Sequence, residues 1–98
     1  MTRDELAESI RRREDVVTRV RKVLVEALAV RRELDEIDPD APLFGTGLGL
    51  DSVDAVELVV SLETEFGIRF PQSTSAKRAM RTVGTVTDVV MFLMGASP

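Results

Sequence analysis

The sequence predicts an all-α domain in which a long first helix, a second helix, a short third helix and a closing helix are joined by loops. In the stretches that would form helices, apolar residues recur at separations of three and four, the spacing of one helical face. Capping residues precede these stretches, while prolines and glycines gather in residues 31–50. With 98 residues, 44% of them hydrophobic, the chain can build one domain with one modest core.

The first helix is expected to run from Arg3 to about Val30. Thr2, just before it, and Glu5, in its first turn, have the spacing of a capping box, which would satisfy amides that have no partner inside the helix. One apolar face is expected along the helix, and its members are Leu6, Ile10, Val17, Val20, Leu24 and Leu28.

A second interpretation of this region stays open at the level of sequence. The leading segment could fray and end near Arg13, with Asp15 capping a shorter helix from Val16. The basic triplet at residues 11–13 is surrounded by acidic residues. We therefore interpret it as a solvated helix face and not as a phosphate-binding patch.

Residues 31–50 form a long connection that prolines and glycines keep from being helical. A loop of this length in a small domain needs anchors in the core, and the four candidates are Ile37, Leu43, Phe44 and Leu48. The glycine-rich run at 45–49 does not indicate a nucleotide site. No strand precedes it, and its spacing fits neither GxGxxG nor GK[ST].

The second helix is expected from Ser52 to Phe66. Asp51 or Ser52 can cap its first amides, and the carboxylates of Asp51 and Asp54 suit the positive end of a helix. Gly67 stands where a left-handed C-cap is favoured. Because flexible glycines precede it, Ser52 is predicted to lie at an exposed helix start.

Two apolar faces divide this second helix. The core-facing set is predicted to be Ala55, Leu58, Val59, Leu62 and Phe66. A narrower stripe consists of Val53, Val56 and Val60, flanked by Glu57 and Glu63. One face is enough to anchor the helix, so the stripe is predicted to meet a partner or a cargo; the alternative is a helix buried on two sides.

Acidic residues near the end of the second helix strengthen the expectation of a partner. Glu63 and Glu65 lie where the helix dipole disfavours them, and the helix holds no Lys or Arg to pair with. Since local stability does not explain these two acids, we expect an acidic surface that meets basic partners.

The last part of the chain can hold two more helices. Residues 71–80 could form a short third helix capped by Ser73 or Ser75. Thr85 is expected to cap the closing helix, with Gly95 after its end. The apolar face of that helix would consist of Val86, Val89, Val90 and Leu93.

Composition limits the classes of function. The chain has no cysteine and no histidine, which excludes disulfides and thiolate catalysis and argues against a self-contained enzyme or a metal site. No apolar run is long enough to span a membrane, and the charged start is unlike a secretory signal, so we expect a cytoplasmic protein. Residues 34–72 carry nine acidic and one basic side chains, which argues against nucleic acid as a partner.

The run GLDSVDAVELVVSLETEFGI at residues 49–68 resembles the signature of acyl carrier proteins, in which an Asp-Ser pair begins the second helix. The positions that match the family's pattern are Asp51, Ser52, Asp54, Val56, Glu57, Leu58, Leu62, Glu63 and Phe66. The resemblance implies a four-helix bundle of acyl-carrier type, over roughly residues 16–94 of a single domain spanning residues 1–98.

The same resemblance implies a function and its residues. Ser52 would be the attachment point of 4'-phosphopantetheine, transferred from coenzyme A by a phosphopantetheinyl transferase, with Asp51 as the flanking motif residue. The arm would carry an acyl group as a thioester, in fatty-acid, specialised lipid or polyketide synthesis. Partner enzymes with basic surfaces, which transfer acyl groups or extend them, would read a surface formed by Val53, Asp54, Val56, Glu57, Val60 and Glu63.

Some features depart from the family's usual pattern. Residues 1–15 extend beyond its usual start, the region before the closing helix is longer, and Lys77, Arg78 and Arg81 are basic where acids are typical. These departures suggest a stand-alone carrier, expected to be a monomer, for a specialised acyl chain. A peptidyl carrier and an unmodified interaction module remain the alternatives.

Overall fold

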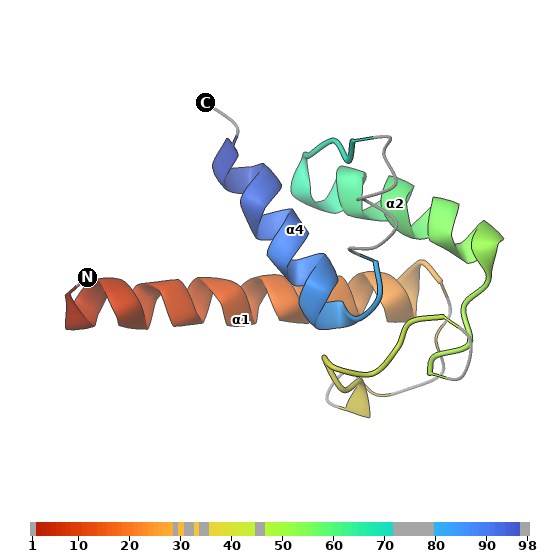
Figure 1. Ribbon diagram of the computed structural model, residues 1–98, viewed down its shortest axis with the longest axis horizontal. Coiled ribbons are helices and arrows are strands. Elements are labelled where there is room, and N and C mark those ends of the chain that lie inside the picture. The colour runs from red at the N-terminus through yellow and green to blue at the C-terminus, as the bar shows by residue number, and fades with distance from the viewer. Residues whose placement is uncertain are drawn as a thin grey trace.

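Three helices make up the described part of the chain: α1 (Arg3–Glu26), α2 (Ser52–Phe66) and α4 (Val83–Ala96) (Figure 1). The computed structural model describes residues 2–28, 30, 33, 36–44, 47–71 and 80–96. Within these residues there is no β-strand, so the all-α prediction is confirmed. The predicted short third helix falls on residues 71–80, and positions 72–79 of it lie outside the described residues.

Helix α1 is continuous from Arg3, which decides between the two sequence interpretations of the N-terminal region. The Thr2 hydroxyl accepts a hydrogen bond of 3.1 Å from the Glu5 amide and caps the first turn. No break occurs near Arg13. The helix ends at Glu26, before the predicted Val30.

The buried face of α1 differs from the predicted face in its N-terminal half. Its buried side chains are Val16, Val20, Val23 and Leu24, whereas Leu6 and Ile10 are 51% and 50% exposed. The reason is the extent of the neighbouring helix: α4 crosses α1 only near its middle, and the N-terminal part of α1 projects beyond it (Figure 1). Periodicity identifies a helical face but not how far a neighbour covers it.

Helix α2 has the predicted boundaries. Gly67 has a φ of 65°, the left-handed C-cap conformation, and the amides of Gly67 and Ile68 both donate to the Glu63 carbonyl. On the predicted core-facing side, Leu58 and Leu62 are fully buried and the other three members are partly buried against the core.

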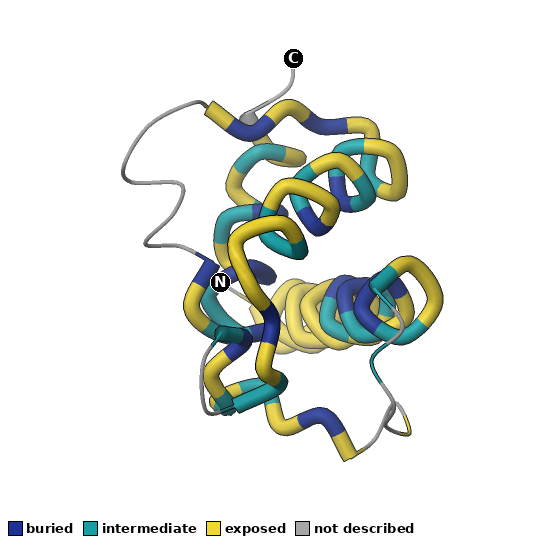
Figure 2. The backbone as a smooth tube through the Cα atoms, turned by 90° about the vertical axis from the view of Figure 1, so that its right-hand side faces the viewer, coloured by how far each residue is buried: buried dark blue, intermediate teal, exposed yellow. Residues whose placement is uncertain are grey.

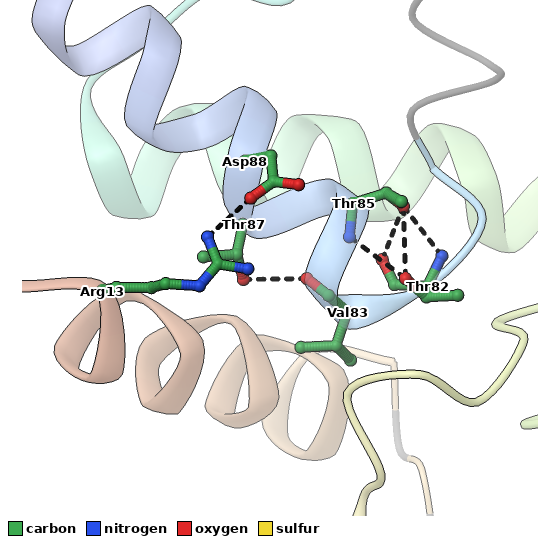
Figure 3. A network of polar contacts seen from close by, with 6 residues as sticks. All are labelled: Arg13, Thr82, Val83, Thr85, Thr87 and Asp88. Carbon is green, nitrogen blue, oxygen red and sulfur yellow. Dashed lines mark hydrogen bonds and ion pairs between the residues drawn. The ribbon is translucent and has the colours of Figure 1, made fainter. Parts of the chain in front are cut away.

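Helix α4 begins at Val83, two residues before the predicted cap at Thr85. Thr82 and Thr85 form a reciprocal pair, since each hydroxyl accepts a 3.0 Å hydrogen bond from the other residue's amide (Figure 3). The expectation that Thr85 is the cap is therefore wrong, and Gly95 lies inside the helix and not after it. A further threonine, Thr87, is fully buried; its hydroxyl donates to the Val83 carbonyl, which satisfies it (Figure 3).

The long connection between α1 and α2 is tied to the start of α4. The Leu43 amide donates to the Arg81 carbonyl at 2.8 Å, and the Gly84 amide donates to the Pro39 carbonyl at 2.9 Å. The second bond satisfies an amide in the first turn of α4 that has no partner within the helix. All four predicted anchors pack on the core, with Ile37 and Leu43 fully buried and Phe44 and Leu48 partly buried.

Two glycines allow this connection to turn back on itself. A Cβ at Gly47 would lie 1.7 Å from the Pro42 carbonyl oxygen, which no side chain tolerates. Gly49 has a φ of 74°, a conformation that favours glycine. The chain can thus leave the core at Leu43 and return to it at Leu50, the residue before the Asp-Ser pair.

The core lies where α1, α2, α4 and the connection meet. Figure 2 shows the buried segments on the inner sides of the helices and the exposed N-terminal turns of α1. The buried apolar residues are Val16, Val20, Val23, Leu24, Ile37, Leu43, Leu50, Leu58, Leu62, Ile68, Phe70, Met80, Val83, Val86 and Val90. None of the helices in the described ranges combines the length and the apolarity that crossing a membrane requires.

Candidate functional site

The first turn of α2 is closed by two aspartates that bracket Ser52. The Asp51 carboxylate accepts from the Asp54 amide, and the Asp54 carboxylate accepts from the Asp51 amide, both at 2.9 Å. Asp51 is therefore the cap, which settles the choice between Asp51 and Ser52. The capping box stabilises the helix start without using the serine.

Ser52 is the first residue of α2, and its side chain is exposed. Within the described residues its hydroxyl makes no hydrogen bond. A hydroxyl in this position is open to modification by another enzyme, because no contact must first be broken to reach it.

The electrostatics of this helix start suit a phosphate ester. The amides of Ser52 and Val53 have no acceptor in the described part of the chain and lie at the positive end of the helix dipole. Helix starts with free amides bind phosphate groups for this reason. The nearby carboxylates of Asp51 and Asp54 offset part of this effect, although each is engaged by one amide.

Ser52 also lies on the rim of an apolar groove of about 640 Å³. The groove is lined by Phe44, Leu50, Asp51, Ser52, Ala55, Val56, Val59 and Met80. The sequence does not identify Leu50 and Met80 as site residues, and it identifies Phe44 only as a loop anchor. These three come from segments on either side of α2 in the sequence, so only the folded chain brings them together.

The valine stripe on α2 faces outward. Val53, Val56 and Val60 are 72%, 66% and 55% exposed, which excludes the alternative of a helix buried on two sides. Glu57 lies among them, is exposed, and has no side-chain partner among the described residues. One face of α2 thus combines three bare aliphatic side chains with an unpaired carboxylate, while Val56 also lines the groove.

The two acids near the end of α2 have partners within the chain, contrary to the expectation from sequence. The Glu63 carboxylate accepts a 2.9 Å hydrogen bond from the Phe70 amide and so fixes the turn after the helix. Glu65 pairs with Arg19 of α1, with 3.5 Å between Arg19 Nε and Glu65 Oε1. The expectation that stability explains neither acid is therefore wrong. Their partners, Phe70 and Arg19, lie outside α2.

The arginines at residues 11–13 likewise bond within the chain. Arg12 pairs with Glu8 at 3.7 Å, Arg11 donates to the Ala7 carbonyl, and Arg13 pairs with Asp88 of α4 (Figure 3). These contacts agree with a solvated helix face. Across the residues that the structure describes, no group of three or more potential metal ligands is found.

A protein-family model described as "Phosphopantetheine attachment site" matches residues 18–90. The matched segment includes the Asp51–Asp54 capping box, all of α2, every residue that lines the groove, and most of α4. It leaves out residues 1–17, most of which form the exposed N-terminal part of α1.

Proposed function

Because the chain belongs to the family of phosphopantetheine attachment domains, we propose that it is an acyl carrier protein and that Ser52 is its attachment residue. Domains of this family bear 4'-phosphopantetheine covalently and serve other enzymes, with no catalytic residues of their own required. The observation that carries the assignment to Ser52 is its exposed, unbonded hydroxyl at the first position of α2.

The residues around Ser52 fit the group. A phosphodiester on its Oγ would lie beside the free amides of Ser52 and Val53, where negative charge is stabilised. The Asp51–Asp54 box holds the helix start in place whether or not the serine is modified. When bound, the group supplies a terminal thiol, on which cargo is carried as a thioester.

The groove at Ser52 supports an acyl cargo over a peptidyl one. Of the described residues that line it, six are apolar, and the two polar ones, Asp51 and Ser52, lie at the helix start. An aliphatic chain gains about 25 cal/mol per Å² when it leaves water for such a surface, whereas a polar aminoacyl group would lose hydrogen bonds to water there. The proposed cargo is therefore a largely aliphatic acyl chain, in fatty-acid, specialised lipid or polyketide synthesis in the cytoplasm.

Partner enzymes are proposed to bind the outward face of α2. The bare side chains of Val53, Val56 and Val60 offer apolar contact, and Glu57 offers an unpaired charge for a basic patch. Asp54 and Glu63 belonged to the predicted recognition surface, but each carboxylate bonds an amide of this chain. We therefore place the main electrostatic contact at Glu57, for the phosphopantetheinyl transferase and for the enzymes that load or extend the acyl chain.

Intact-mass measurement after co-expression with a broad-specificity phosphopantetheinyl transferase tests the attachment residue. The wild-type chain is expected to gain the mass of one phosphopantetheine group, and Ser52→Ala is expected to gain none. Ser61→Ala is the matched control, because it removes a hydroxyl from the same helix away from its start.

Either of two results would overturn this assignment. The first is a wild-type chain that stays unmodified under conditions that modify a known carrier. The second is a mass increment that persists in Ser52→Ala.

A further inference from the structure

The N-terminal part of α1 carries large apolar side chains that are half exposed and that no described residue covers fully. Every residue from Thr2 to Asp15 is exposed, including Leu6 and Ile10. Leu6 and Ile10 are four residues apart, so they lie side by side on one helical face. In Figure 1 this segment of α1 projects beyond its crossing with α4.

The N-terminal turns of α1 continue a packed helix and gain little from tertiary packing of their own. Most helical stability in proteins comes from packing of an apolar face, and in α1 the buried side chains begin only at Val16. The stabilising contacts among the described residues of this segment are the Thr2 cap, an exposed pair between Arg12 and Glu8, the bond from Arg11 to the Ala7 carbonyl, and the ion pair of Arg13 with Asp88 of α4. Each is worth about 1 kcal/mol or less, which leaves packing of Leu6 and Ile10 as the missing contribution.

The charged residues Arg3 and Glu14, beside Leu6 and Ile10, indicate what kind of surface could pack there. Eleven residues separate Arg3 from Glu14, so at 3.6 residues per turn they lie about 20° apart around the helix axis. Both therefore flank the Leu6–Ile10 pair on the same edge. Neither side chain has an ion-pair partner among the described residues.

The apolar pair and the charged pair share one centre. The midpoint of Leu6 and Ile10 is residue 8, and the midpoint of Arg3 and Glu14 falls between residues 8 and 9. A two-fold axis through that point, perpendicular to the helix, places a second copy of the segment antiparallel to the first, with complementary side chains facing each other. Each Leu6 then meets an Ile10, and each Arg3 meets a Glu14, in an antiparallel pair of helices.

We propose that two copies of the chain associate through α1 as this antiparallel pair. Leu6 packs against the partner's Ile10, Arg3 pairs with the partner's Glu14, and each contact occurs twice. This departs from the monomer expected from sequence. The proposal does not depend on the carrier function, since α2, which begins at Ser52, lies toward the opposite end of the molecule from the N-terminus (Figure 1).

The proposed contact area is small. Since the central contact has only two aliphatic layers, the area falls in the range of weak, concentration-dependent interfaces.

Sedimentation equilibrium of the full chain, from micromolar concentrations to about 1 mM, tests the association. The average mass is expected to rise with concentration from 10.8 kDa toward twice that value. Ile10→Ser is expected to weaken the dimer at least tenfold. Val56→Ser is the matched control, because it removes an aliphatic side chain from α2 that is at least as exposed, 66% against 50%, and should leave the dimer unchanged.

A charge swap tests the antiparallel geometry itself. Arg3→Glu alone and Glu14→Arg alone each place like charges opposite one another and are expected to weaken the dimer severalfold. The double variant restores opposite charges and is expected to recover the wild-type association at low salt.

Three outcomes would overturn the proposal. One is a mass that stays at the single-chain value up to the highest concentration. Another is a double charge variant that associates no better than the single variants. The third is an Ile10→Ser variant that leaves the mass unchanged but slows loading by a partner enzyme, which would show that the face serves that enzyme. Circular dichroism of each variant shows whether its helices are retained.

Discussion

At the scale of single residues, two neighbours at the start of α2 have separate roles: Asp51 caps the helix, and Ser52 is the proposed attachment residue. Either could have capped α2, but the reciprocal bonds between Asp51 and Asp54 leave the serine hydroxyl unbonded. A serine that served as the cap would have to give up its hydrogen bond on modification. The capping box therefore keeps the helix start intact across the proposed change in Ser52.

Two glutamates of α2 also differ in whether their side chains bond within the chain. Glu63 has a hydrogen bond to the Phe70 amide, whereas the Glu57 side chain has no partner among the described residues. Substituting both acids together would mix an effect on folding with an effect on recognition. Single substitutions separate the two.

Glu57→Lys is expected to slow modification by the transferase, whereas Glu63→Lys is expected to lower the stability of the fold. Glu57→Lys should leave the free energy of unfolding within about 0.5 kcal/mol of wild type and slow modification by the transferase severalfold, with the difference shrinking as salt screens the charge. Glu63→Lys should lower the free energy of unfolding by about 1–3 kcal/mol, because it leaves the Phe70 amide unsatisfied. Urea unfolding and initial modification rates measure the two effects. Equal modification rates for Glu57→Lys and wild type at low salt would contradict the proposed role of Glu57.

At the scale of elements, α1 supplies the cation that α2 lacks. Arg19 Nη2 donates a 2.9 Å hydrogen bond to the Glu65 carbonyl in the last turn of α2, where the helix dipole favours positive charge. The guanidinium also lies 4.3 Å from the centre of the Phe66 ring. One side chain thus joins the two helices through a hydrogen bond, an ion pair and a ring contact.

Arg19→Met is expected to lower the free energy of unfolding by about 1–2 kcal/mol, since it keeps the apolar stem but removes the charge and its hydrogen bond. Arg12→Met is the control, because its pair with Glu8 is exposed within a single helix and should change stability by less than about 0.5 kcal/mol. Chemical denaturation followed by circular dichroism measures both variants. If the two lose the same amount, the contact between α1 and α2 does not depend on Arg19.

At the scale of the whole molecule, the connection between α1 and α2 belongs to the core. Leu43 is as fully buried as Leu58 of α2, and hydrogen bonds from the connection reach the first turn of α4. Because the same segment leads through Leu50 into the Asp-Ser pair, the position of Ser52 depends on this packing.

Leu43→Ala is accordingly expected to lower the free energy of unfolding by about 2–5 kcal/mol, the range of a buried helical leucine such as Leu58→Ala. Leu48→Ala, in the same connection but only partly buried, should lower it less. Thermal and urea unfolding compare the three variants. A Leu43→Ala chain as stable as Leu48→Ala would show that the connection only rests on the bundle.

The sequence by itself determined α2 and the residue at its start. A capping residue at Asp51 or Ser52, two apolar faces and a glycine after Phe66 are signals that act within one or two helical turns, so the boundaries of α2 follow from local chemistry. The match to the family model confirms the resemblance carried by the same stretch. The attachment role of Ser52 stays a prediction until its modification is measured.

Tertiary structure alone decided features that depend on residues far apart in the chain. The start of α4 is one: Thr82 and Thr85 are both acceptable caps locally, but the carbonyl of Pro39 accepts the Gly84 amide and so supports the earlier start. The groove at Ser52 is another, because it needs Met80 beside α2. The exposure of the N-terminal turns of α1 is a third. The packing of α4 sets how much of α1 is covered, and the apolar periodicity of α1 does not indicate it.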